Sequence, residues 1–390
     1  MRRTYLVLTV AAAMAMAVAV GLAQQAGPDK VLKTVKAGGT GGFDYIYADA
    51  AGRRLYIPRG ADQAATPPVP ARMTVFDLDT LASVGEIADI RANGAAVDTA
   101  SGHGFASSKP VTMWDTKTLK IIKTINVDGN PDGIIADPFN QRVYILSHQA
   151  PHVTVIDAKS GDVLGTLDLG GAPEQAATDG SGHLYIDVSD KANVAVVDTK
   201  AMTVTAHYDL GDKGNGVAGL AMDAKNHILF VACRNSGIPP ASPAAPMMVI
   251  MNALDGKIIT TLPLAGSTDG AVFNPATMEA FSSHGNGTMT IVKENSPTSF
   301  VVEQDLQTMM GAKTLTLDSK TNHVLSMAAE YAPPPAAAAP AAPPAPGVPP
   351  QGGPGGFPGG RGGSGGFGGG RGPGRGVMLP GSFSILVVGR

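Results

Sequence analysis

A pattern of four short strands recurs seven times along this 390-residue chain, and it constrains the fold more than any other feature. One copy places strands at 131–137, 142–146, 153–157 and 163–169. Each is rich in β-branched or aromatic residues, and Gly, Pro, Asp or Asn lies at its ends. No segment between them is long or periodic enough for a helix.

An acidic or amide residue closes the first strand of every copy, and these residues stand 39 to 51 positions apart: Asp49, Asp98, Asp137, Asp179, Asp223, Asn274 and Asp318. A four-stranded unit of this size is typical of a propeller blade. We therefore predict an all-β fold, a seven-bladed β-propeller of four-stranded blades. A solenoid is the alternative.

The two ends of the chain favour a closed ring over a solenoid. The seventh copy stops after its third strand, and a segment that resembles a fourth strand, 31–36, stands near the N-terminus. The N-terminal strand can therefore complete the last blade, which removes an open sheet edge. A solenoid has no reason to split one repeat in this way.

Residues 1–23 have the pattern of a secretory signal peptide: a basic start at Arg2 and Arg3, an apolar run, and small residues at the expected cleavage site. We expect a secreted or periplasmic protein. An uncleaved membrane anchor is the alternative, and membrane association is expected only in that case.

We assign 30–331 and 377–390 to the propeller, and 332–376 to a Pro/Ala/Gly-rich loop inserted in blade seven. That loop is too poor in large apolar residues to fold, so we expect it to be disordered. Smaller insertions at 60–71 and 235–246 occupy the same joint, between the second and third strands, in blades one and five. The three insertions should therefore emerge on one face.

Charge and cysteine content exclude some classes of protein. From 29 basic and 32 acidic residues, the balance is −5 without Arg2 and Arg3, and −8 when the three arginines of the Gly-rich loop are also left out. An acidic body is a poor polyanion binder, so we expect no nucleic-acid partner. Cys233 is the only cysteine and cannot form an intramolecular disulfide. We expect a monomer.

The residue five positions before each closing residue should lie where the innermost strand begins, near the central channel. These residues are Asp44, Asn93, Asp132, Glu174, Ala218, Asp269 and Lys313. Four carboxylates there can hold a cationic ligand or a divalent cation such as calcium, because hard cations favour several oxygen ligands. The alternative is that the acids accept hydrogen bonds from the preceding turns.

Four further residues end second strands on the same predicted face: Arg59, His148, Arg234 and His284. We take them as candidates for ligand contact, although histidines in loops are often only solvated. No catalytic residue and no metal-ligand motif is assigned, because the chain has no G-x-S-x-G nucleophile elbow between a strand and a helix, no P-loop and no H-E-x-x-H pattern.

The second-strand segments 55–59, 143–147 and 184–188, with the V-x-V-x-D and turn at 153–161, resemble the YVTN repeat of secreted YncE-like propellers. The resemblance covers 30–331 and 377–390. It implies an exported seven-bladed propeller without an assigned reaction and supplies no catalytic residue. The terminal asparagine of the motif is absent here, since Arg59, Ser147 and Val188 stand at its positions in these segments.

The sequence thus favours an exported, noncatalytic propeller that binds a ligand or protein partner through its loop-bearing face. One alternative is a lactone hydrolase of the related seven-bladed type, in which the carboxylates predicted near the central channel bind a metal that activates water. Another is a cell-surface structural protein. A quinone-dependent dehydrogenase is disfavoured because such propellers repeat tryptophans between blades, and Trp114 stands alone.

Overall fold

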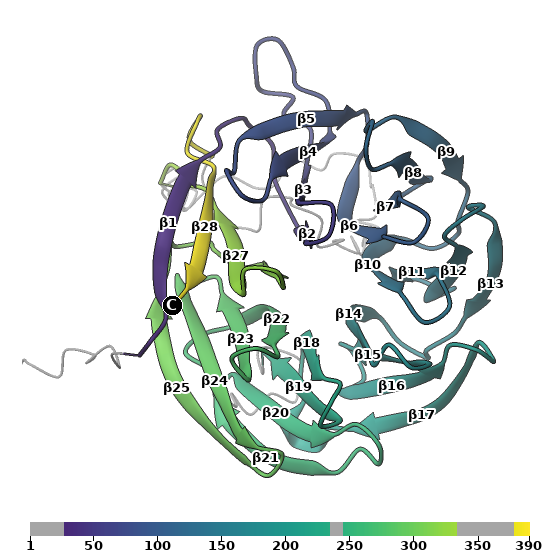
Figure 1. Ribbon diagram of the computed structural model, residues 1–390, viewed down its shortest axis with the longest axis vertical. Helices are drawn as coiled ribbons and strands as arrows, with labels where there is room; N and C mark the ends of the chain where they lie inside the picture. The colour runs from purple at the N-terminus through teal and green to yellow at the C-terminus, as the bar shows by residue number, and fades with distance from the viewer. Residues whose placement is uncertain (1–26, 235–244, 334–377) are drawn as a thin grey trace, which may run out of the picture.

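A computed structural model describes residues 27–234, 245–333 and 378–390 of the chain. Over these ranges the chain forms seven four-stranded antiparallel sheets and one short 3₁₀ helix, η1 (Gly211–Lys213). The sheets are arranged in a ring around a central opening (Figure 1). The predicted seven-bladed β-propeller is therefore confirmed. The segments 1–23 and 235–244, and the predicted loop from residue 334 onward, lie outside the described residues.

Each blade runs from an inner first strand to an outer fourth strand. Blades one and two consist of β2 (Tyr47–Asp49), β3 (Arg54–Arg59), β4 (Arg72–Asp77) and β5 (Ser83–Ala88), and of β6 (Ala92–Asp98), β7 (His103–Ser108), β8 (Val111–Asp115) and β9 (Ile121–Ile125). Blades three and four consist of β10 (Pro131–Asp137), β11 (Arg142–Ser147), β12 (Val153–Asp157) and β13 (Val163–Leu167), and of β14 (Pro173–Thr178), β15 (His183–Val188), β16 (Asn193–Asp198) and β17 (Thr203–Asp209).

Blades five and six consist of β18 (Val217–Asp223), β19 (Ile228–Cys233), β20 (Met247–Asn252) and β21 (Ile258–Pro263), and of β22 (Thr268–Asn274), β23 (Glu279–His284), β24 (Thr288–Ser296) and β25 (Ser299–Gln307). Blade seven combines β26 (Leu315–Asp318), β27 (His323–Ala328) and β28 (Ser384–Gly389) with β1 (Lys30–Lys36).

The recurring acid has a structural role at the end of the first strand. The Oδ1 atom of Asp49 accepts a hydrogen bond from the backbone N–H of Gly52, and Asp98 makes the same kind of contact to Ser101. Asn274 fills the position in blade six and accepts from the N–H of Ala276. Each side chain thus caps the turn into the second strand, which explains why the repeat keeps a short oxygen-bearing residue there. Asp179 does the same one residue beyond the end of β14.

Hydrophobic side chains fill every seam between neighbouring blades. In the seam between blades one and two, Tyr56 and Trp114 pack with ring centroids 5.5 Å apart. The seam between blades seven and one is of the same kind and joins Phe43 and Ile57 to Met327 and Phe383. Because the last seam is packed like the others, the ring closes through side chains as well as through strand pairing.

The split blade supplies the pairing that closes the ring. Strand β1 runs antiparallel to β28, with Lys30 opposite Gly389 and Lys36 opposite Ser384. The predicted completion of blade seven by the N-terminal strand is consistent with this sheet. In the described part of the chain, no helix has the length and apolar character needed to cross a bilayer.

Removal of β1 should destabilise the whole ring, because it exposes the edge of β28 and part of the seam to blade one. We expect a variant lacking residues 1–36 to unfold at a clearly lower temperature than one lacking residues 1–26, as measured by circular dichroism. Equal unfolding midpoints for the two truncations would show that β1 does not hold the ring closed.

Candidate ligand site at the channel mouth

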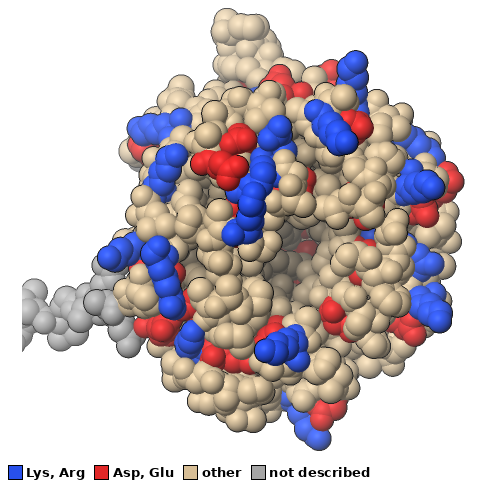
Figure 2. Space-filling view, in the orientation of Figure 1, with Lys and Arg blue, Asp and Glu red and all other residues tan. Residues whose placement is uncertain are grey.

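Six residues predicted to ring the channel come together at one end of the inner strands: Asp44, Asn93, Asp132, Glu174, Asp269 and Lys313. Asn93, Asp132, Glu174 and Asp269 lie near the beginnings of β6, β10, β14 and β22. Asp44 and Lys313 instead precede β2 and β26, so two inner strands begin later than the repeat predicts. A space-filling view shows a hollow at the centre of the ring with acidic atoms inside it (Figure 2). We call this group, with the residues that contact it, the mouth cluster.

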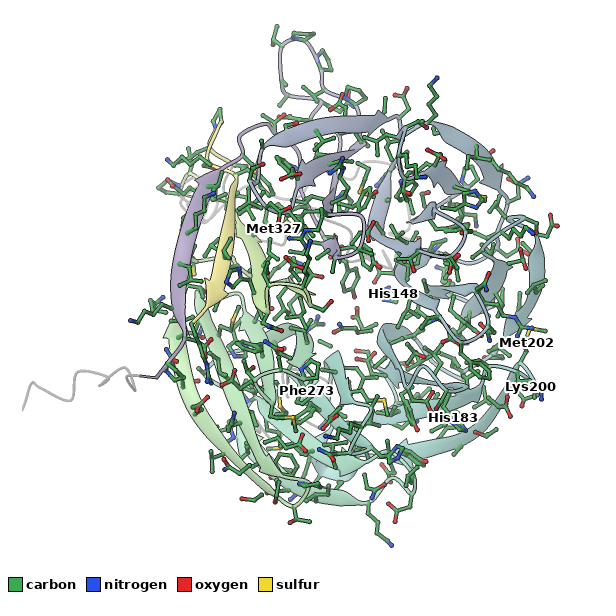
Figure 3. The ribbon with its side chains drawn as sticks, in the orientation of Figure 1. His148, His183, Lys200, Met202, Phe273 and Met327 are labelled. Atoms are coloured by element: carbon green, nitrogen blue, oxygen red, sulfur yellow. The ribbon has the colours of Figure 1, made fainter. Side chains whose placement is uncertain are left out.

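One arc of the mouth cluster is centred on His148, which follows β11 at the edge of the central opening (Figure 3). Its Nε2 atom lies 3.2 Å from Oδ2 of Asp132 and 3.7 Å from Oε2 of Glu174. Asn93 donates to the other oxygen of Asp132 over 2.9 Å, and the hydroxyl of Tyr45 donates to Oε2 of Glu174 over 3.0 Å. Each carboxylate is thus held by a neighbour while one oxygen faces the imidazole.

The other arc alternates bases and acids. The guanidinium of Arg234 lies 3.7 Å from Oε1 of Glu174 and 3.3 Å from Oδ1 of Asp269. The ammonium of Lys313 lies 3.0 Å from Asp269 and 4.0 Å from Asp44. The two arcs share Glu174, so residues from six of the seven blades form one connected set of charges.

The electrostatics follow from burial combined with this pairing. Hydrogen bonds to Asp132 and Glu174 raise the pKa of His148 to about 10, so its imidazole is a cation between two carboxylates at neutral pH. Burial raises the pKa of Asp44 well above its usual range, and the other mouth acids add to that rise while Lys313 opposes it. Asp44 is 7% exposed, and its Oδ2 atom accepts no hydrogen bond from the described residues. The cluster therefore has more carboxylate than its bases satisfy.

Two long polar side chains cross the channel beneath the mouth. Tyr45 of blade one reaches Glu174 of blade four, and Gln175 donates from Nε2 to the carbonyl of Ala271 in blade six. The Oε1 atom of Gln175 accepts from the N–H groups of Leu220 and Ala271. These contacts link blades that are not neighbours in the ring, one to four and four to six, through side chains of the inner-strand region.

Sequence reasoning missed Tyr45, Gln175 and Asp187. Asp187 lies in β15 with no exposed surface, and its Oδ1 accepts from the N–H groups of Glu174 and Gln175. Burial raises its pKa to about 7. The sequence did carry a signal for Asp187, because it is the one acid in the otherwise apolar strand 184–188. A buried acid needs hydrogen-bond donors around it, which indicates a polar site nearby.

The structure places Arg59 outside the mouth cluster. Its guanidinium donates to the carbonyls of Gly38, Thr40 and Gly41, and it lies 3.8 Å from the ring centroid of Phe383. Arg59 therefore fastens the segment that leads from β1 into blade one. A buried arginine that bonds backbone carbonyls and stacks on an aromatic ring is a structural cation.

His284 is also separate from the mouth cluster, because it ends β23 with no exposed surface. Its Nε2 atom lies 3.0 Å from Oγ1 of Thr290, whose own hydroxyl donates to Asp305. Nε2 must therefore carry the proton, and Nδ1 has no hydrogen-bond partner among the described residues. Burial lowers the pKa of His284 to about 4. The equivalent residue in blade three is Ser147, and His148 lies one position later, after β11 has ended, where it faces carboxylates.

Three residues of the mouth cluster lie close enough together to hold a metal ion. One donor atom each from Asp132, His148 and Glu174 lies within 4.8 Å of the other two. One imidazole with two carboxylates is a donor set that suits Zn²⁺ and similar ions. Asn93 donates to Asp132 and Tyr45 donates to Glu174, and hydrogen bonds of this kind hold the ligands of metal sites in position.

The chain matches no protein-family model. A search of curated proteins gave no match either. Among solved structures, it is similar to a Kuenenia stuttgartiensis hydrazine synthase chain, with 16% identity, a TM-score of 0.61 and coverage of 73% of this chain and 92% of that one. It is also similar to the U3-55K structure, with 8% identity, a TM-score of 0.59 and coverage of 78% and 92%. These likenesses show the propeller fold alone, and the YVTN-repeat assignment stays a prediction.

His284 should make the stability of the propeller fall in mild acid. Its folded-state pKa of about 4 lies below the usual 6.5, so the unfolded chain binds the proton first as the pH falls. The stabilisation is complete above pH 6.5 and is lost between that pH and about 4, by about 3 kcal/mol. We expect His284→Gln to flatten the fall in urea-unfolding free energy over this range. The exposed His207→Gln should leave the slope unchanged, and an unchanged slope in His284→Gln would contradict the assignment.

Proposed function

We propose that this protein is an exported, noncatalytic binding propeller that holds a divalent metal ion at the channel mouth through Asp132, His148 and Glu174. The observation that carries the proposal is the proximity of one donor atom from each of these three residues. Export is supported by the signal-like segment 1–23.

The donor set favours a transition metal over calcium. The sequence alone suggested an all-oxygen site built from the acids of the ring, for which calcium is the natural ion. The structure instead places the imidazole of His148 between two of those acids, while Lys313 engages Asp269. A nitrogen donor beside two carboxylates suits zinc better. The ion would replace the proton on His148, so the carboxylates keep a cationic partner.

The surroundings of the three residues support a binding role. Asp132 and Glu174 are 3% and 6% exposed, so an ion there is largely removed from bulk water. Arg234 and Lys313 both pair with Asp269 on the other arc. Asp132 and Glu174 on the His148 arc therefore remain the carboxylates that an ion would bind. The site faces the side where the second strands end, which is also the side of the 60–71 insertion.

Zinc titration by calorimetry, with metal analysis of protein purified without chelator, tests this proposal. We expect one zinc ion per chain and loss of binding in Asp132→Asn and His148→Gln. Asn93→Ala removes only a partner that orients Asp132 and should weaken binding about 10- to 100-fold.

The matched control is Asp168→Asn, because His152 and Asp168 form another histidine–carboxylate pair in blade three, 2.6 Å apart at the surface. This variant should bind zinc like the wild type. Equal binding by wild type and Asp132→Asn, or no binding by either, would refute the site. Hydrolysis of lactones by the zinc-loaded protein would establish the catalytic alternative instead.

A further inference from the structure

A second group of carboxylates lies where the two ends of the propeller meet. Asp29 directly precedes β1, Glu279 begins β23, and Glu303 lies in β25. One oxygen from each lies within 4.8 Å of the other two. We call these three residues the closure cluster. Glu279 and the mouth cluster are at opposite ends of blade six, because the mouth lies where β23 ends.

The bases beside the closure cluster do not balance its charge. Arg390, which follows β28, contacts Glu279, lies 3.5 Å from Glu303 and 3.8 Å from Asp29. Lys293 acts on the acids from further away, since its ammonium donates to the carbonyl of Thr277. One guanidinium in contact with three carboxylates leaves an excess of negative charge in a buried place.

Three carboxylate oxygens of the closure cluster make no hydrogen bond with the described residues: Oδ2 of Asp29, Oε2 of Glu279 and Oε2 of Glu303. Asp29 is 3% exposed, and Glu279 has no exposed surface. Burial and Glu279 raise the pKa of Asp29 to about 6, and the contact with Glu279 raises that of Glu303. The oxygens of Asp29 and Glu303 face the guanidinium of Arg390 at 3.8 and 3.5 Å without a hydrogen bond, and Oε2 of Glu279 has no partner among the described residues. Buried carboxylate oxygens held this loosely are costly, and a cation bound among them would relieve that cost.

A cavity lies beside the cluster at Asp29, and Gln304 holds Asp29 in place. The cavity has a volume of about 100 Å³, and Arg390, Thr277 and Asn322 are among its other lining residues. The hydroxyl of Thr277 is also buried without a hydrogen-bond partner. Gln304 fixes Asp29 by accepting from its N–H and donating to its carbonyl. Additional oxygen ligands and waters can therefore complete a coordination shell.

We propose that the closure cluster is a calcium site that ties the N-terminal strand to blade six. Every donor in it is a hard oxygen, and no nitrogen or sulfur ligand belongs to the set, which favours Ca²⁺ over zinc. An ion held by Asp29, Glu279 and Glu303 joins the outer strand of blade seven to the second and fourth strands of blade six, β23 and β25. Calcium thereby stabilises the closed ring.

The test is thermal unfolding of the full chain after removal of divalent ions, with and without CaCl₂. Calcium at 100 times its Kd should raise the unfolding midpoint by about 4 °C. The shift should disappear in Asp29→Asn and in Glu303→Gln, and magnesium should give a smaller one. Arg390→Gln removes the competing cation and should lower the Kd for calcium.

Glu86→Gln is the matched control, because Glu86 also lies on an outer strand and pairs with an arginine, Arg72, at 3.2 Å. It should keep the full calcium shift. If Asp29→Asn does not fold, the calcium shift of Glu303→Gln is the deciding measurement, because Glu303 is only half-buried. No calcium shift in wild type and Arg390→Gln, or an undiminished shift in Glu303→Gln, would overturn the proposal.

This site is independent of the proposed zinc site. Asp132→Asn should keep the calcium shift, and Glu303→Gln should keep zinc binding. Failure at one site therefore leaves the other unaffected.

Discussion

The pairing of β1 with β28 is the constraint on which the rest of the structure depends. A propeller blade buries its two faces only against neighbours, so the ring must close for the seam between blades seven and one to exist. Here the closing strand comes from the opposite end of the chain, with Lys30 opposite Gly389. Arg59 and Phe383 reinforce the joint from inside, since the guanidinium that holds the segment after β1 also stacks on a ring at the start of the last strand. The closure cluster adds charge at the other end of the same strand pair, where Asp29 meets blade six.

The ring also explains how residues far apart in sequence form one site. Equivalent positions in successive blades converge on the axis, so one residue per repeat is enough to build a charged mouth. Asp132 and Glu174 are 42 positions apart, yet both contact His148. The arrangement concentrates acids in a place of low solvent exposure, where their repulsion is relieved only by bases or bound cations. That physical demand connects the fold to the proposed metal binding.

The fold and much of the mouth were predictable because both follow the repeat period. Once the closing acid is aligned, Asp132 and Lys313 fall at the channel without knowledge of the structure. What the repeat left undecided was which residues at the ends of second strands face the mouth. His148 follows β11 and faces two acids, whereas His284 is the last residue of β23, one position earlier in the repeat, and is enclosed in its own blade. Arg59 likewise serves the closure of the ring. The closure cluster could not be predicted, because Asp29, Glu279 and Glu303 come from positions that the repeat does not relate.

The register of the closing strand has a mechanical consequence. Because Lys30 lies beside Gly389, the two ends of the closing pair leave the ring at the same point. A pulling force applied at these two positions would break the hydrogen bonds between β1 and β28 one after another, starting at this end. A force along the strands in opposite directions would instead load all of these bonds at once. An ion across the first few residues of this pair would act where such tearing has to begin.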